Sequence, residues 1–201
     1  MRRKNEISLL SSILTLIFVV IFTCIRANSV DKTIGENILR SYNCDYHSLS
    51  MITKIDVVVN NEPMLIKGNF HLIEDPLTMY NSKGEIVAFV GDDYNFINQD
   101  NHGIYENGNF VMNLEGQFNM VGDNYNCVNA SGDIIATVEF NGTNTYGKML
   151  DSDGNLIADY NSNYWRNDYT INIYQDTTYS DNTLLLLFAS FVSDFKADNS
   201  N

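Results

Sequence analysis

The chain has 201 residues, 44% of them hydrophobic and only two of them proline, which suits one domain with a sizeable core and excludes a low-complexity tail. It carries 25 acidic and 12 basic residues, a formal charge of -13 at pH 7, and four of the bases lie within residues 1–27. Residues 28–201 therefore hold eight bases against 24 acids, a charge of -16. Because they also lack a basic patch interleaved with aromatics, they exclude nucleic acid as a partner.

Residues 1–27 are predicted to be a membrane anchor. Ile7–Ile25 is an uncharged run of 19 residues, and a helix of that length spans about 28 Å, close to the hydrocarbon thickness of a bilayer. A cleaved signal peptide is the alternative, but its apolar core is usually about 7–15 residues long, and residues 25–27 make a poor cleavage site. We expect an uncleaved, single-pass signal-anchor helix. The bases at residues 2–4 favour a domain on the extracytoplasmic side, and Arg26 with later bases weakens that orientation.

Residues 28–48 are polar and are predicted to be a linker, with a short helix around Gly35–Ser41. From residue 49 the chain becomes a series of short β-prone runs broken by Gly, Asn and Asp, with no long helical periodicity between them. This pattern favours an antiparallel sheet or barrel over an α/β fold. The clearest predicted strands are Ile55–Val59, Met64–Ile66, Phe110–Leu114 and Tyr169–Ile173.

Three segments of the predicted β domain, 80–90, 128–138 and 150–160, repeat one another. In each, an Asn or Asp is followed by two variable residues and a Gly, which is the chemistry of a type I turn in a short hairpin loop. A strand with two aliphatic residues and an alanine then leaves the turn. Asn107-Gly108 indicates a fourth hairpin.

Strand alternation assigns the faces of these repeats. In the second repeat it places Ile134 and Ala136 on the inner face. In the third it places Leu156 and Ala158 on the inner face and Asp159 on the outer face. The alanine faces inward in all three repeats, which indicates that a bulky element lies against the sheet.

The final segment of the chain is the candidate for that bulky element. Leu184–Val192 is apolar on nearly every side and follows good N-cap residues, so it predicts a buried helix, assigned to residues 182–196. About ten apolar residues are too few to cross a bilayer. A strand-rich domain ending in such a helix indicates a barrel wrapped around it. Residues 197–201 are expected to be a disordered tail.

The repeated hairpin, Gly-[Glu/Asp/Asn]-[Ile/Leu]-[Val/Ile]-Ala, and the terminal segment Asp181–Phe195 together resemble the LURP-one-related branch of the tubby C-terminal-like superfamily, which also includes phospholipid scramblases. The resemblance covers residues 49–196 and implies a closed antiparallel β-barrel threaded by a hydrophobic C-terminal helix. It also implies phosphoinositide binding through clustered Lys and Arg, but the bases here are few and scattered, so no lipid-binding residue is carried over. Those bases are Lys54, Lys67, Lys83, Lys148, Arg166 and Lys196.

No catalytic, cofactor-binding or metal-binding residue is assigned from the sequence. Asp151–Asn155 resembles the start of a calcium loop, but Leu156 stands where Gly is needed and Ser162 where Glu is needed, so a hairpin turn explains it. Serine-hydrolase, P-loop and dinucleotide-binding motifs do not occur. The histidines, which follow no zinc spacing, are His47, His71 and His102.

Three further features of the sequence allow more than one interpretation. Cys44 and Cys127 either pair in an oxidising compartment or remain free buried thiols. Asn129-Ala130-Ser131 and Asn141-Gly142-Thr143 are glycosylation triplets, which matter only in a eukaryotic lumen. Trp165 is expected to be a partly buried barrel aromatic rather than a surface anchor.

These observations predict a membrane-anchored, non-enzymatic binding or scaffold module of tubby-like fold. The expected partners are the membrane, through residues 7–25, and a protein or small ligand whose identity the sequence does not reveal. No cofactor is expected. The alternative is a lipid-linked role, either lipid recognition or scramblase-like lipid movement. A hydrolase without a sequence motif is a third class, which a preformed pocket containing histidine would favour.

Overall fold

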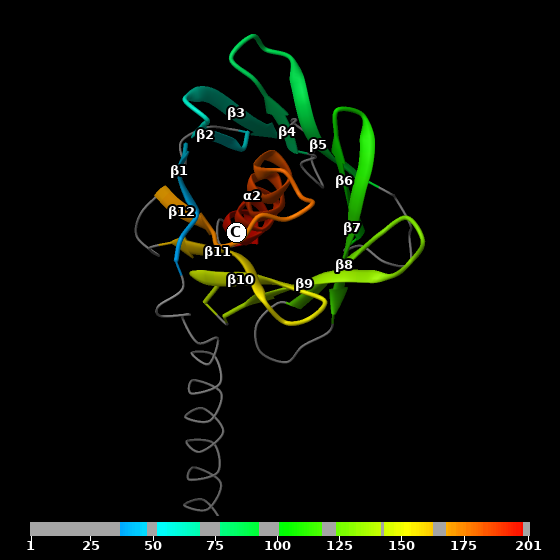
Figure 1. The fold of residues 1–201 in the computed structure, drawn as a ribbon. Helices are drawn as coiled ribbons and strands as arrows, with labels where there is room; N and C mark the ends of the chain where they lie inside the picture. The colour runs from blue at the N-terminus through cyan, green and yellow to red at the C-terminus, as the bar shows by residue number, and fades with distance from the viewer. Residues whose placement is uncertain are drawn as a thin grey trace, which may run out of the picture.

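The computed structural model describes residues 37–47, 52–68, 77–92, 101–117, 124–141, 143–162 and 168–198. Within these residues, twelve strands form one closed antiparallel barrel, in which each strand pairs with its neighbours in sequence and the first and last strands pair to close the ring (Figure 1). This confirms a mainly β, closed antiparallel barrel with a C-terminal helix. The elements are β1 (Arg40–Tyr46), β2 (Lys54–Val59), β3 (Glu62–Gly68), β4 (Leu77–Tyr80), β5 (Ile86–Asp92), β6 (Asn101–Glu106), β7 (Asn109–Gln117), β8 (Asn124–Val128), β9 (Ile134–Phe140), β10 (Tyr146–Asp151), β11 (Leu156–Ser162), β12 (Asp168–Ile173) and α2 (Asp181–Asp198).

The predicted anchor at residues 1–27 lies outside the described residues, and so does the first part of the predicted linker, residues 28–36. In the part of the chain that the structure describes, no helix is both long and apolar enough to span a bilayer. The four most clearly predicted strands are confirmed and lie within β2, β3, β7 and β12.

The linker prediction for residues 28–48 is wrong in its last part, because Arg40–Tyr46 forms β1. This strand pairs with β12 along residues 40–45 and with β2 along residues 44–46, and residues 37–41 contain no helix. Tyr42 and Cys44 are buried while the residues on either side of each are not. The polarity that resembles a linker is therefore the outer face of a strand. The barrel includes Arg40 and does not start at residue 49.

Three hairpin loops, 81–85, 129–133 and 151–155, share one geometry, and we call them the Asx loops. The side-chain Oδ1 of the first residue accepts hydrogen bonds from the backbone N–H groups of the third and fifth residues, at 2.8 to 3.0 Å. The fourth residue is a glycine with a φ of 79° to 87°, a left-handed conformation in which any Cβ is strained. The predicted hairpins of the three repeats are confirmed.

The first and fifth side chains of each Asx loop also bond each other. Asn81 donates to Glu85 at 2.8 Å, and Asn129 donates to Asp133 at 3.2 Å. In the third loop the two groups are exchanged, because the amide of Asn155 donates to the carboxylate of Asp151 at 2.9 Å. Each loop is thus closed by one amide–carboxylate pair, which explains why both residue types recur at these positions.

A β-bulge follows the turn in four hairpins and alters the alternation assumed from the sequence. In each hairpin the register passes over one residue of the outgoing strand, and the side chain of that residue packs against the core. The residues passed over are Val87, Val111, Ile135 and Ile157. The prediction that Ile134 faces inward is wrong, because this residue precedes a bulge and is 54% exposed. Ala136, beyond the same bulge, is fully buried as predicted.

Asp159 is buried rather than exposed on the outer wall. It alternates with the inward Ala158 and Tyr160, yet its own exposure is 4%. Its carboxylate accepts hydrogen bonds from the Asn172 amide and the Tyr174 hydroxyl, each at 2.8 Å. The chain that leaves β12 therefore covers this part of β11 from outside.

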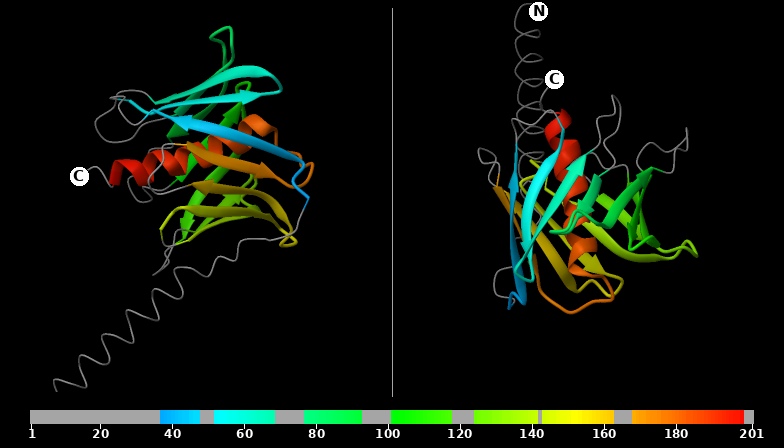
Figure 2. Two further views of the ribbon diagram at one scale, coloured as in Figure 1. Left: turned by 90° about the vertical axis from the view of Figure 1, so that its left-hand side faces the viewer. Right: turned by 90° about the horizontal axis from the view of Figure 1, so that it is seen from above.

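The helix α2 lies within the ring of strands (Figure 1) and runs from one end of the barrel to the other (Figure 2). Every side chain from Leu184 to Ala189 is fully buried. The helix backbone runs closest to β2, β4, β5 and β6. On another side, Phe140 and Tyr160 fill the space, and their ring centroids lie 6.4 and 6.1 Å from that of Phe188. The helix extends beyond the predicted range of 182–196 into residues assigned to the tail.

One end of the barrel, which we call the hairpin end, collects the tight turns. Because successive strands alternate in direction, the turns after β2, β4, β6, β8 and β10 all lie there, together with the first turn of α2 (Figure 2). Arg40 pairs with Ile173, the last residue of β12, so β1 also begins at this end. The described chain therefore enters the barrel beside the start of α2.

Candidate functional site

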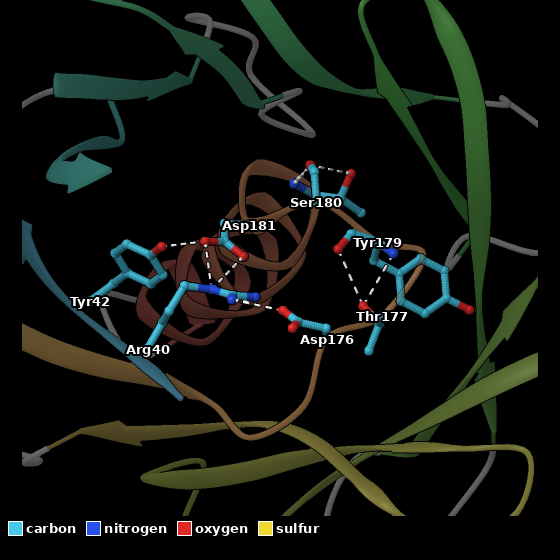
Figure 3. A network of polar contacts seen from close by, with 8 residues as sticks. Arg40, Tyr42, Asp176, Thr177, Tyr179, Ser180 and Asp181 are labelled. Carbon is cyan, nitrogen blue, oxygen red and sulfur yellow. Dashed lines mark hydrogen bonds and ion pairs between the residues drawn. The ribbon is translucent and has the colours of Figure 1, made fainter. Parts of the chain in front are cut away.

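The start of α2 is fastened to β1 by a charged network (Figure 3). Arg40 donates from Nη1 to Asp176 at 2.9 Å, and its Nε lies 2.9 Å from Asp181 Oδ2. The Tyr42 hydroxyl donates to the same Asp181 carboxylate. The Arg40 and Asp181 side chains are 32% and 15% exposed, so the pair is partly shielded from water. The carboxylate of Asp181 lies in the first turn of α2, where the positive end of the helix dipole stabilises it.

A second set of contacts ties this turn to β6. The backbone N–H of Thr183 donates to Ser180 Oγ at 3.1 Å, which makes Ser180 the N-cap. The hydroxyls of Ser180 and Thr183 donate to the two carboxylate oxygens of Glu106, at 2.6 and 3.1 Å. The start of α2 is therefore held by strands from two sides of the ring.

This network positions the start of the helix and shifts the pKa values of two of its members. The hydrogen bond to Asp176, with the charge of Asp181, raises the pKa of Arg40. Burial, together with the hydrogen bond to Asp181, raises the pKa of Tyr42 to about 12. Arg40 therefore stays cationic and Tyr42 stays neutral at physiological pH. The hydrogen-bonding groups named here bond one another, which is the arrangement of a structural latch.

An open depression of about 480 Å³ lies on the outer wall of the barrel. Two of its polar groups already bond other protein groups. Lys148 lies 3.3 Å from Glu139, and the Tyr174 hydroxyl donates to Asp159. A small ligand would have to compete with these bonds, so the depression is the weaker candidate site. Its lining residues are Lys148, Leu150, Gly154, Asn155, Leu156, Tyr174 and Gln175.

A stronger candidate is the apolar surface of the hairpin end. Among the described residues, six large apolar side chains are exposed, and each lies within two residues of a hairpin turn or just before β1. Single exposed apolar residues are ordinary, but all six lie at one end of the barrel, which makes this end the most apolar part of the described outer surface. We call this set the apolar rim: Ile38, Leu39, Val58, Ile86, Phe110 and Ile134.

Acidic residues stand directly beside the apolar rim. Glu85 precedes Ile86, Asp133 precedes Ile134, and Glu62 opens β3 at the same end; all three acids are exposed. Together with the charge of -16 over residues 28–201, they give this end a negative potential. A negative potential is complementary to basic groups and opposed to anionic ones.

The calcium-like residues form an Asx loop instead of a metal site. Hydrogen bonds from the side chain and backbone of Asn155 lower the pKa of Asp151, whose carboxylate closes the loop. Among the described residues, no group of three or more His, Cys, Asp or Glu side chains is placed to hold a metal.

Cys44 and Cys127 are free and buried, which decides between the two alternatives left by the sequence. Burial raises the pKa of each thiol to about 12. Nucleophilic attack by cysteine needs the thiolate, so neither residue is poised for it.

The histidines do not converge in the described structure. His47 Nε2 lies 2.6 Å from Asp56 Oδ2 on the outer surface, and His102 lies in β6. His71 and Trp165 lie outside the described residues.

Sequence reasoning missed two features of the hairpin end. One is the latch, the network of Arg40, Tyr42, Asp176 and Asp181, and the other is the apolar rim. The alternation of Tyr42 and Cys44 with polar residues was the available signal for β1, and with it for the Arg40 latch. For Ile86 and Ile134 the signal was the pair of adjacent aliphatics after the first two Asx loops, because strict alternation forbids such a pair and a bulge accommodates it.

Comparison of the chain with protein-family models, with curated proteins and with solved structures found no match.

Proposed function

We propose that this protein is a membrane-anchored, non-enzymatic binding or scaffold module of tubby-like fold. Residues 7–25 anchor it, and the domain lies on the extracytoplasmic side. The tubby-like assignment is supported by the repeated hairpin and by the apolar terminal helix lying within a closed antiparallel ring. A non-enzymatic role is supported by the latch at the start of α2, whose polar groups are engaged with one another.

The observation that carries the proposal is that α2 fills the barrel. Barrels that carry small molecules hold them in the interior. Here the interior holds the fully buried run Leu184–Ala189 and the rings packed against it. Recognition therefore takes place on the outer surface, where the apolar rim is the most distinctive described feature.

The chemistry of the hairpin end selects the kind of partner. The core of a protein interface is apolar and its margin is polar, which matches exposed aliphatics bordered by acids such as Glu85 and Asp133. Complementary charge speeds encounter and excludes wrong partners. The proposed partner is a protein segment that carries both basic and apolar side chains.

A lipid-linked role is the second candidate, and one observation favours it. The described chain enters the barrel at the hairpin end, directly after Ile38 and Leu39. An anchor at residues 7–25 would therefore keep the apolar rim near the bilayer. The acids of the Asx loops oppose this role, because they lie at the same end and repel anionic headgroups.

The test uses the full-length protein in its native membrane with a photo-reactive amino acid at Ile86 or Ile134. The matched control carries the same group at Asp45, which is exposed on β1 toward the opposite end. We expect one discrete protein adduct from both rim positions and none from the control. The cross-linked peptide should be basic and apolar, and the yield should fall as salt is raised.

Three outcomes would overturn the proposal. Adducts with lipid alone would favour the lipid-linked role. Adducts with a second copy of the chain would replace the partner by self-association. Equal adducts from the rim and from Asp45 would mean that the apolar rim is not the recognition surface.

A further inference from the structure

One sequence motif, the glycosylation triplet at Asn129, lies in an accessible place. Asn129 opens the Asx loop 129–133 at the hairpin end, and residues 130–133 are all exposed. A Cβ built on Gly132 would meet no atom within 4 Å, so the space beside the loop is open. The Asn129 Nδ2 donates to Asp133 at 3.2 Å, which uses one of its two N–H bonds. The other N–H can be replaced without breaking the loop.

The second triplet, at Asn141, is placed less favourably. Its Nδ2 donates to Thr145 Oγ1 at 3.2 Å, and its Oδ1 accepts from the backbone N–H groups of Thr145 and Tyr146. These contacts are partly buried, and Tyr146 itself is buried. The hydroxyl that the triplet requires, on Thr143, lies 2.9 Å from Thr145 Oγ1. This amide is held in partly buried contacts, whereas that of Asn129 lies at the start of an exposed loop.

We propose that Asn129 accepts an N-linked glycan when the domain enters a eukaryotic secretory lumen. The Asn129 Nδ2 forms a bond to the anomeric carbon of an oligosaccharide carried on a lipid diphosphate. The bond from that carbon to the diphosphate oxygen breaks, the lipid diphosphate leaves, and the amide nitrogen gives up one proton. This inference rests on the proposed extracytoplasmic placement of the domain.

The chain contains a matched control for this site in the first Asx loop. Asn81 has the same contacts as Asn129, because its Oδ1 accepts from residues 83 and 85 and its Nδ2 donates to Glu85. Lys83 stands where Ser131 completes the triplet in the second loop. Lys83→Thr therefore creates a triplet in the same geometry. Ser131→Lys removes the natural one and leaves Asn129 in place.

The experiment expresses the full chain in cells with a eukaryotic secretory pathway and measures the gel shift caused by an endoglycosidase. The wild type should carry one glycan, which mass spectrometry should place on Asn129. Ser131→Lys should abolish the shift, Asn141→Gln should leave it unchanged, and Lys83→Thr should add a second glycan.

The possible results distinguish an error about Asn129 as the glycan acceptor from an error about the extracytoplasmic position of the domain. A Lys83→Thr chain glycosylated at Asn81 beside an unmodified wild type would overturn Asn129 as an acceptor while leaving the domain in the lumen. A shift lost only in Asn141→Gln would overturn it as well. No glycan in any variant, with the domain digested by protease added from the cytoplasmic side, would overturn the placement and the site together.

Discussion

Gly147 is the position where the structure leaves least room for a side chain. It lies in β10 and pairs with Phe140 on one side and Tyr160 on the other. A Cβ added there would stand 2.5 Å from Cδ1 and Cε1 of Phe140, closer than real Cβ contacts come. The Phe140 ring is 2% exposed, and its centroid lies 4.8 Å from that of Phe191. Gly147→Ala therefore forces a packed ring to move against α2.

The magnitude follows from two opposing effects. Overpacking a core costs about 1–3 kcal/mol. Replacing Gly by Ala where φ is not positive recovers about 0.4–1 kcal/mol by restricting the unfolded chain. Gly147 is absent from the positive-φ residues, so the backbone adds no strain. The clash with a buried ring places the overpacking cost in the upper part of its range, and we expect a net loss of about 1–2 kcal/mol.

The assay is chemical denaturation of the full-length protein in detergent, with Gly147→Ala, Phe140→Leu and the double variant compared in one cycle. Because the Phe140→Leu substitution removes the ring edge that lies over Gly147, the double variant should lose at least about 1 kcal/mol less than the sum of the single losses. Losses that add to within about 0.5 kcal/mol would refute the steric reasoning, as would a Gly147→Ala protein of unchanged stability.

Three further predictions concern the latch, the Asx loops and the thiols. Tyr42→Phe removes a hydrogen bond to a charged acceptor and should cost about 1 kcal/mol in chemical denaturation, with a smaller effect when Asp181 is already replaced by alanine. Asn129→Asp sets a second carboxylate against Asp133 and should lower stability by roughly a few tenths of a kcal/mol at pH 7; adding Asp133→Asn should restore it by rebuilding the pair found at 151–155. The two buried thiols should resist alkylation at pH 8 until the protein unfolds, as measured by mass spectrometry. Stability should fall as pH rises from about 9 toward 12, because only the unfolded chain then releases the thiol protons.

The parts of the fold that could be predicted are those set by local chemistry. The Asx loops combine Asn or Asp with a glycine three residues later, and both requirements are met within five residues. The helix α2 was visible because an apolar run without a polar face has nowhere stable to lie except a core. Ala136 was correctly assigned inward because its strand is regular beyond the bulge.

The features that the sequence did not reveal share a different cause. Each of them depends on residues outside its own segment of the chain. β1 exposes one polar face and is completed by β12, whose pairing partners lie more than 120 residues away. Asp159 lies on the face opposite Ala158 and Tyr160 as predicted, but no pattern within β11 reveals that the chain leaving β12 buries it there. Ile134 is exposed because a bulge takes the alternation out of step by one residue. Ile86, Phe110 and Ile134 of the apolar rim stand beside such bulges, and the strand topology places all six rim residues at one end of the barrel, so the rim becomes visible only in the folded chain.

The helix α2 forms the core of the barrel rather than an appendage to it. Six of its side chains, Leu184–Phe188 and Phe191, are at most 1% exposed. At about 1.5–3 kcal/mol each, their burial contributes roughly 9–18 kcal/mol, as much as the whole margin of about 5–15 kcal/mol for a typical domain.

The decisive measurement is therefore chemical denaturation of a chain ended after Thr183, beside the full-length protein in the same detergent. We expect the shortened chain to show no cooperative transition and to aggregate. A cooperative transition that survives the truncation would contradict the role of α2 as the core, because the barrel would then hold its shape without the helix that fills it.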